Sequence, residues 1–160
     1  FSKYNIKKIL DAPCGDYYIM DKAQFKDIEY LGIDLVQEQL DLNKQKYPDG
    51  NFQQLNMITD TLPMSDLVFS RDILIHFSDY DIKKFIKNCC KSGCKYLMTN
   101  TYTKIDKNQD MDGILGWRFI NFEKYPFHFP TPIEIIKEGA HNDTGKSMAL
   151  WKLHDLFNML

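Results

Sequence analysis

Short apolar runs alternate with segments of helical spacing along most of this chain, and that alternation limits the folds open to it. The runs that read as strands cover residues 6–13, 29–35, 51–58, 66–73 and 95–102. The segments that read as helices cover residues 17–25 and 36–47, and a third helix follows Ser78. Strands joined through helices form right-handed β-α-β units, which build a mostly parallel sheet with both faces covered.

The helix after Ser78 has the strongest local signals. Ser78 stands three residues before Asp81, as in a capping box, and Gly93 is a suitable residue to end the helix. One apolar face is formed by residues at helical spacing, namely Ile82, Phe85, Ile86, Cys89 and Cys90. The lysines of this segment point elsewhere, so we interpret them as a solvated face and not as a phosphate site.

Two further apolar runs close the chain, at residues 132–138 and 148–153. The stretch between them is too short for a helical crossover, so they are predicted to form an antiparallel hairpin at one edge of the sheet. The predicted fold is therefore α/β, with a seven-stranded, mostly parallel sheet that ends in this hairpin. The 160 residues are expected to form a single domain with one core.

The composition argues against several classes of protein. Hydrophobic residues make up 44% of the chain and charged residues 26%, which is typical of a folded globular protein and not of a disordered one. No apolar run approaches the ~20 residues that a membrane-spanning helix needs. The formal net charge is −2, whereas a dedicated nucleic-acid binder usually carries a basic excess. We therefore expect no membrane span and no nucleic-acid partner.

The cysteines and the first residues bear on the protein's surroundings. Four cysteines are few for a disulfide scaffold, and adjacent cysteines such as Cys89 and Cys90 rarely pair with each other, so we predict no disulfide framework. No signal peptide or transit sequence is visible, so we expect a cytoplasmic protein. The chain starts at Phe1 without a methionine, and a predicted strand follows within a few residues. We expect a trimmed N-terminus, and a larger parent chain or a homodimer stays open.

The first strand ends in a tight turn that suits a nucleotide ligand. The turn reads DAPCGD from Asp11 to Asp16, and the second strand ends in Asp34, about twenty residues after Gly15. Open α/β sheets bind ligands at the carboxyl ends of their strands, and an acid at the position of Asp34 typically accepts hydrogen bonds from ribose hydroxyls. The turn has one glycine where dinucleotide sites have three. Its two acids would repel a pyrophosphate and attract a cation, which favours S-adenosylmethionine over NAD. The alternative is an exposed turn whose acids merely cap a helix.

These residues resemble the motifs of class I S-adenosylmethionine-dependent methyltransferases, a Rossmann-like sandwich. ILDAPCGD stands where that family has its first motif, and GIDL stands at its ribose-binding acid. The resemblance covers nearly the whole chain and includes the terminal antiparallel hairpin. It departs at Pro13 and Asp16, where many members have glycines. The D-x-P-C-G-D turn is similar to a subgroup of small methyltransferases, many of them found among glycan and capsule biosynthesis genes.

The resemblance implies a set of contacts to S-adenosylmethionine. Asp11 would orient the ammonium group, Asp34 would hold the ribose, and Leu35 would pack on the adenine. Asn56 stands where many members have an aspartate that faces the adenine amino group, with Met57 beside it. The full predicted cofactor-binding set is Asp11, Ala12, Pro13, Cys14, Gly15, Asp16, Asp34, Leu35, Asn56, Met57, Ser70 and Arg71.

The segment after the fourth strand is expected to face the methyl acceptor. Methyl transfer is an in-line displacement that depends mainly on alignment, and a hydroxyl acceptor also benefits from a base near neutrality. His76 is the best candidate, because imidazole titrates near pH 6.5. Arg71 and Asp72 could contact the methionine carboxylate or the acceptor, and Asp72 could orient His76. The alternatives are a histidine that only packs at the start of the next helix, and a structural ion pair.

Residues 103–131 form a long aromatic segment before the hairpin. Trp117 and Arg118 follow Gly116, and an aromatic platform beside a hydrogen-bond donor suits a sugar or a flat aromatic acceptor. The alternative is that the aromatic side chains of this segment cover one face of the sheet. We interpret Trp117 and Arg118 as the acceptor site.

Three functional hypotheses follow. The first is an O-methyltransferase that acts on a hydroxyl of a sugar or glycan-linked acceptor, with His76 as the base. The second is an N-methyltransferase on a small amine or a protein, which needs no base if the amine arrives neutral. The third is a non-catalytic, methyltransferase-like binding domain, against which Asp11 and Asp34 argue. None of these requires a metal ion.

Overall fold

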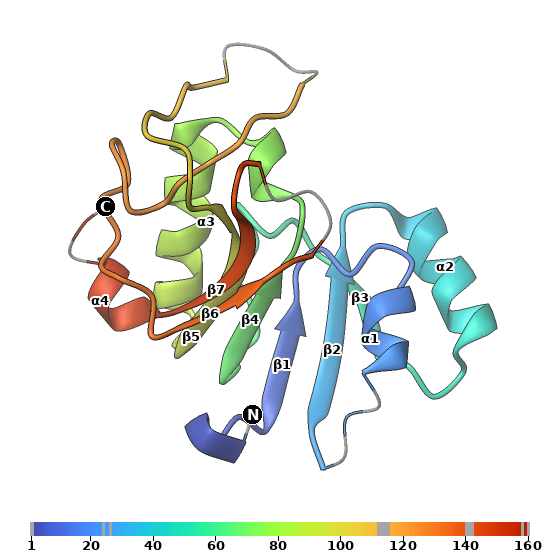
Figure 1. Ribbon diagram of the computed structural model, residues 1–160. Coiled ribbons are helices and arrows are strands. Elements are labelled where there is room, and N and C mark those ends of the chain that lie inside the picture. Colours follow the sequence, from blue (N-terminus) through green and yellow to red (C-terminus); the bar gives the residue numbers. More distant parts are fainter. Residues whose placement is uncertain are drawn as a thin grey trace.

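The structure, a computed structural model, describes residues 2–23, 25, 27–111, 116–139, 143–157 and 159 (Figure 1). The described residues form one seven-stranded sheet in the order β3-β2-β1-β4-β5-β7-β6. The strands are β1 (Lys8–Asp11), β2 (Glu29–Asp34), β3 (Phe52–Gln54), β4 (Leu67–Ser70), β5 (Tyr96–Tyr102), β6 (Glu134–Lys137) and β7 (Lys146–Lys152). Strands β3, β2, β1, β4 and β5 pair in parallel, and β7 is antiparallel to both of its neighbours. The predicted mostly parallel sheet with an antiparallel C-terminal hairpin is confirmed.

Helices lie on both sides of this sheet. They are α1 (Tyr18–Lys22), α2 (Gln37–Lys46), α3 (Asp79–Lys91) and α4 (Leu153–Phe157), with short 3₁₀ turns η1 (Ser2–Tyr4) and η2 (Leu74–His76). Adjacent residues of β1 face opposite clusters: Ile9 packs with Met20 of α1, and Leu10 packs with the apolar face of α3. In Figure 1, α3 and α4 lie beside β4, β5 and β7, whereas α1 and α2 lie beside β2 and β3.

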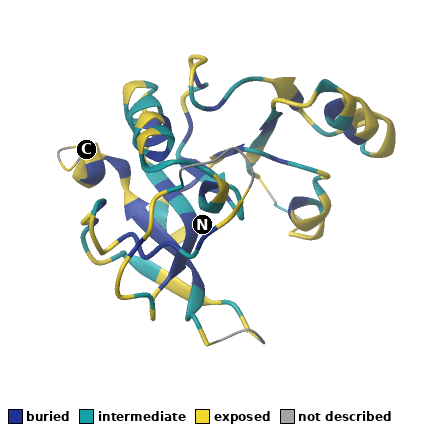
Figure 2. Ribbon diagram, turned by 90° about the horizontal axis from the view of Figure 1, so that it is seen from above, coloured by how far each residue is buried: buried dark blue, intermediate teal, exposed yellow. Residues whose placement is uncertain are grey.

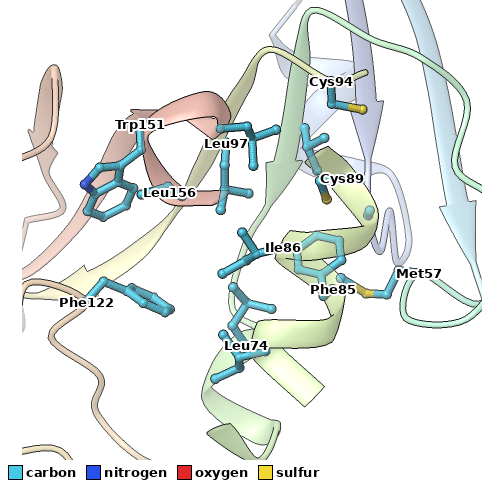
Figure 3. Packing of buried hydrophobic residues seen from close by; sticks show 14 of the residues in the cluster. Met57, Leu74, Phe85, Ile86, Cys89, Cys94, Leu97, Phe122, Trp151 and Leu156 are labelled. Carbon is cyan, nitrogen blue, oxygen red and sulfur yellow. The ribbon is translucent and has the colours of Figure 1, made fainter. Parts of the chain in front are cut away.

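Helix α3 forms as its sequence predicts. The Asp81 amide donates to Ser78 Oγ over 3.1 Å, which caps the first turn, and Gly93 has a φ of +75° just beyond the end of the helix. Its buried face contributes Phe85, Ile86 and Cys89 to the main core (Figure 3). Among the described helices, none combines the length and apolar character that crossing a bilayer requires.

Several elements differ in extent from the prediction. The first run is a strand only over Lys8–Asp11; the Ala12 amide still donates to the Phe69 carbonyl of β4, and Pro13 has no amide to continue the pairing. The helix predicted over residues 17–25 is shorter, and residue 24 lies outside the described part of the chain. Helix α4 was not predicted. It begins at Leu153, which together with Leu156 is buried against the α3 side of the core.

The segment after β5 crosses to the hairpin without a helix in its described part. Its buried aromatic residues, Phe122, Phe127 and Phe129, pack around Trp151 of β7 on the α3 side of the sheet. Figure 2 shows that buried residues follow the strands, while the outer sides of the helices are exposed. Three of the six Phe, Tyr and Trp side chains of this segment therefore cover one sheet face, whereas Trp117 and Tyr125 are exposed.

Candidate active site

Two cavities lie at the carboxyl ends of β1, β2 and β4, one on each side of Pro13. The first, here called the α1 pocket, has a volume of about 180 Å³ and is lined by Asp11, residues 13–20, Phe69 and residues 71–73. The second, here called the β2 pocket, has a volume of about 390 Å³ and is lined by Pro13, residues 33–36, residues 55–58, Ile73 and Phe77. Both are lined by Pro13 and Ile73, so the two cavities are neighbours and together suit an elongated ligand.

The turn between β1 and α1 is held by backbone bonds and by Asp34. The Cys14 amide donates to the Ile33 carbonyl over 2.8 Å, and Gly15 has a φ of +51°, a conformation that favours glycine. Asp34 Oδ2 accepts from the Gly15 amide (3.1 Å), and its Oδ1 accepts from the Val36 amide (3.0 Å). Asp34 thus fixes the turn and also lines the β2 pocket.

Asp11 ends β1 and is only 3% exposed. Its Oδ2 accepts a hydrogen bond from the Tyr30 hydroxyl over 2.7 Å. Burial raises the pKa of Asp11 to about 7, the Tyr30 hydrogen bond lowers it, and the charge of Asp34 raises it. Within the described residues, Asp11 has no cationic partner. A buried carboxylate that faces a cavity without a cation fits a cationic ligand, since such a group is costly to leave uncompensated.

The β2 pocket has the apolar character that an adenine ring needs. Leu35 and Val36 are exposed apolar side chains on one side, and Met57 is buried on another. Asn56 also lines this pocket, but its Oδ1 accepts from the Ile58 amide over 2.9 Å and so closes a local turn. Burial, followed by the charges of Asp11 and Asp34, raises the pKa of the Cys14 thiol to about 12, so this thiol stays neutral beside the two carboxylates.

Arg71 and Asp72 line the α1 pocket and belong to an ion cluster. Arg71 Nε and Nη2 donate to Glu138 Oε1 over 3.1 and 2.9 Å. Lys146 Nζ lies 2.7 Å from Asp72 Oδ1, and the Asp72 amide donates to Asn100 Oδ1 over 2.6 Å. Glu138, Lys146 and Asn100 were missed by sequence reasoning. For Glu138 and Lys146 the available signal is position, because both are charged residues beside the turn of the predicted hairpin, whereas Asn100 lies on β5.

Ser70 and His76 lie outside the linings of both pockets. Ser70 is fully buried at the end of β4. His76 is exposed on η2, and its Nδ1 lies 2.8 Å from the Gly116 carbonyl oxygen. Asp72 is engaged with Lys146, so the orienting partner of His76 is Gly116 and not Asp72.

Trp117 and Arg118 are adjacent but have different environments. Trp117 is 59% exposed, and its ring centroid lies 4.9 Å from that of Phe119. Arg118 is 8% exposed, and its Nη2 donates to the Phe77 carbonyl (2.9 Å) and to Asp79 Oδ1 (2.7 Å). Trp117 is thus open to an acceptor, whereas the Arg118 guanidinium anchors the aromatic segment to the start of α3.

Comparisons with known proteins bear on the fold. No protein-family model and no curated protein matches the chain. A solved S-adenosylmethionine-dependent methyltransferase from Clostridium acetobutylicum ATCC 824 matches with a TM-score of 0.67 at 17% identity, over 94% of this chain and 86% of that one. The methyltransferase domain of bacterial CtHen1-CN matches with a TM-score of 0.69 at 14% identity, over 94% and 92%. Human N-acetylserotonin methyltransferase, solved with its cofactor, matches with a TM-score of 0.68 at 12% identity, over 95% of this chain and 49% of that one.

These likenesses extend over almost the whole chain. They agree with the seven-stranded, mostly parallel sheet described above. The chain has the fold of the class I S-adenosylmethionine-dependent methyltransferases.

Proposed function

We propose that the protein is an S-adenosylmethionine-dependent methyltransferase that methylates a hydroxyl of a sugar or glycan-linked acceptor. The observation that carries the proposal is Asp11, a buried carboxylate that faces a cavity at the switch point of the sheet without a described cation beside it. The fold and the solved methyltransferases that resemble it support the choice of cofactor.

Each of the two pockets would bind one part of the cofactor. The β2 pocket would take the adenine between Leu35 and Met57, and Asp34 would accept hydrogen bonds from the ribose. The α1 pocket would take the methionine portion, with Asp11 beside its ammonium group. When bound, the cofactor supplies an electrophilic methyl group on a sulfonium. The protein's part is to hold that group in line with the acceptor oxygen, and this alignment is the main source of rate.

His76 would accept the proton of the acceptor hydroxyl. A carbonyl oxygen can only accept, so the contact with Gly116 requires that His76 carries its hydrogen on Nδ1. Nε2 then keeps its lone pair and is free to act as a general base. The tautomer is therefore set by a backbone atom of the same segment that bears Trp117.

The acceptor would lie between Trp117 and the ion cluster. An exposed indole ring suits the apolar face of a sugar, and Asp72, Glu138 and Lys146 offer hydrogen-bonding groups for its hydroxyls. The carboxylates and cations of this cluster neutralise each other, which favours a neutral polyol over a charged acceptor. Arg118 contributes by fixing the backbone that presents Trp117.

Calorimetry and product analysis test this proposal. S-Adenosylhomocysteine should bind the purified protein, and incubation with S-adenosylmethionine and a panel of sugars should give a product heavier by one methylene group. Absence of binding would sink the methyltransferase proposal. Turnover with amines and none with sugars would replace it with N-methylation.

A further inference from the structure

Tyr30 and Asp11 come from neighbouring strands and meet beneath the turn. Asp11 pairs with Gly32 in the β1–β2 register, and Tyr30 precedes Gly32 by two residues, so both side chains lie on the same face of the sheet. The Tyr30 hydroxyl donates to Asp11 Oδ2 over 2.7 Å. This is a charge-assisted hydrogen bond in a buried place, where such bonds are strongest.

The surroundings hold the Tyr30 hydroxyl in position. The centroid of the Tyr30 ring lies 4.9 Å from that of Tyr17 and 6.4 Å from that of Phe52. Gly32 provides the space for the hydroxyl, because a Cβ at this residue would lie 2.8 Å from Tyr30 Oη and 2.8 Å from Cys14 Cβ. The lack of a side chain at Gly32 therefore leaves room for the Tyr30 hydroxyl beside Asp11.

The other titratable groups around Asp11 leave Tyr30 as its partner. Asp34 approaches from the end of β2 and repels it, while Cys14 in the turn stays neutral because its pKa is raised. Arg71 lines the same pocket, yet its guanidinium is bonded to Glu138 and near Asp72. In the described part of the chain, Tyr30 is the hydrogen-bond donor to the Asp11 side chain.

We propose that Tyr30 is a positioning residue whose hydroxyl holds the Asp11 carboxylate in place to bind the ammonium group of S-adenosylmethionine. This inference rests on the proposed function. It adds a residue of β2 to the site, one that lies outside the linings of both pockets and acts only through Asp11.

The positioning role of Tyr30 predicts a specific pH dependence of ligand affinity. Ammonium binding needs a charged Asp11, so ligand affinity rises as pH passes the pKa of Asp11, which lies at about 7. Affinity falls again at higher pH, when the ligand's amine loses its proton. Removal of the Tyr30 hydroxyl raises the pKa of Asp11, so the rising limb moves to higher pH while the falling limb stays.

Calorimetric titration with S-adenosylhomocysteine from pH 6 to 9 measures this shift. In Tyr30→Phe, affinity at pH 6.5 should fall by about tenfold for each unit by which the Asp11 pKa rises, and the gap to wild type should narrow toward pH 8.5. Tyr47→Phe is the matched control, because it removes a hydroxyl from the same aromatic cluster and should follow wild type. A loss that is equal at every pH, or no loss, would overturn the positioning role.

A second measurement separates this inference from the proposed function. Carbon-13 NMR titration of the Asp11 carboxyl in the ligand-free protein should give a higher midpoint in Tyr30→Phe than in wild type. Equal midpoints would overturn the role of Tyr30 alone. A wild-type protein that binds neither S-adenosylmethionine nor S-adenosylhomocysteine would overturn the proposed function, and the role in ammonium binding with it.

Discussion

His76 Nδ1 and the carbonyl oxygen of Gly116 lie 2.8 Å apart, although 40 residues separate them in the sequence. The Arg118 amide also donates to the Ile75 carbonyl, over 3.1 Å, so the two segments are joined by a backbone bond next to this contact. The proposed base and the exposed Trp117 are therefore parts of one local unit. A change at either end should affect the other through the backbone.

Replacement of His76 should reduce turnover without reducing cofactor binding. In His76→Ala, the rate constant for methyl transfer to a hydroxyl acceptor should fall by about 100-fold or more, because general base catalysis is typically worth that factor. S-Adenosylhomocysteine affinity should stay within twofold, since His76 lines neither pocket. Turnover assays and calorimetry measure the two effects. His154→Ala is the control, because this exposed histidine lies on α4, and a normal rate in His76→Ala would show that the base is elsewhere.

Replacement of Arg118 should destabilise the fold. The guanidinium is buried and bonded to Asp79 and to two backbone carbonyls, so Arg118→Ala leaves a partly buried carboxylate without its partner. We expect the free energy of unfolding to fall by about 3 kcal/mol, as for other broken buried ion pairs. Urea denaturation measures it. The exposed pair Lys8–Glu29 is the comparison, and Lys8→Ala should cost less than about 1 kcal/mol. Equal losses in the two variants would refute the anchoring role.

A methyl group at Gly32 should disturb the cofactor turn from behind. In Gly32→Ala the new Cβ would overlap Tyr30 Oη and Cys14 Cβ, so both must shift. Stability should fall by about 1–3 kcal/mol, as for other overpacked positions, and S-adenosylhomocysteine affinity should fall at least tenfold. Gly139→Ala is the matched control, because a Cβ there meets no atom within 4 Å. Normal cofactor binding in Gly32→Ala would contradict this account of the turn.

The charged Asp11 side chain should lower the stability of the fold near neutral pH, although the same charge is needed to bind the cofactor. Its pKa is raised from 3.8 to about 7 by burial, so the folded state binds a proton more tightly than the unfolded chain. Stability from this group is fully present below pH 3.8 and is lost as pH rises through 7. At pH 8, the free energy of unfolding of Asp11→Asn should therefore exceed that of wild type by up to about 4 kcal/mol, and this gain should shrink toward pH 4. Urea denaturation measures the difference. The same variant should bind S-adenosylhomocysteine poorly, and equal stability at pH 8 would contradict the burial of a charged Asp11.

Much of the fold could be predicted because its signals are local. The alternation of apolar runs and helical segments predicted the parallel half of the sheet, and the short gap before the last run predicted the antiparallel hairpin. The Ser78 cap and the apolar face of α3 are contacts within a few residues, which a sequence pattern contains directly. The turn from Asp11 to Asp16 and the acid at Asp34 could be recognised because strand ends in such sheets meet at one edge.

The partners of the site residues could not be predicted, because they join residues far apart in the chain. The sequence by itself determined which side chains reach the carboxyl edge: Asp11 and Asp34 are the last residues of strands, and Arg71 and Asp72 follow one directly. Tertiary structure alone decided that Asp72 meets Lys146, that His76 is held by Gly116, and that Arg118 turns inward to Asp79. These contacts depend on strand order and on the path of an irregular crossover, and neither follows from local periodicity. The bond from Tyr30 to Asp11 is of the same kind, since it exists only because β1 and β2 pair in the register that places Gly32 beside Asp11.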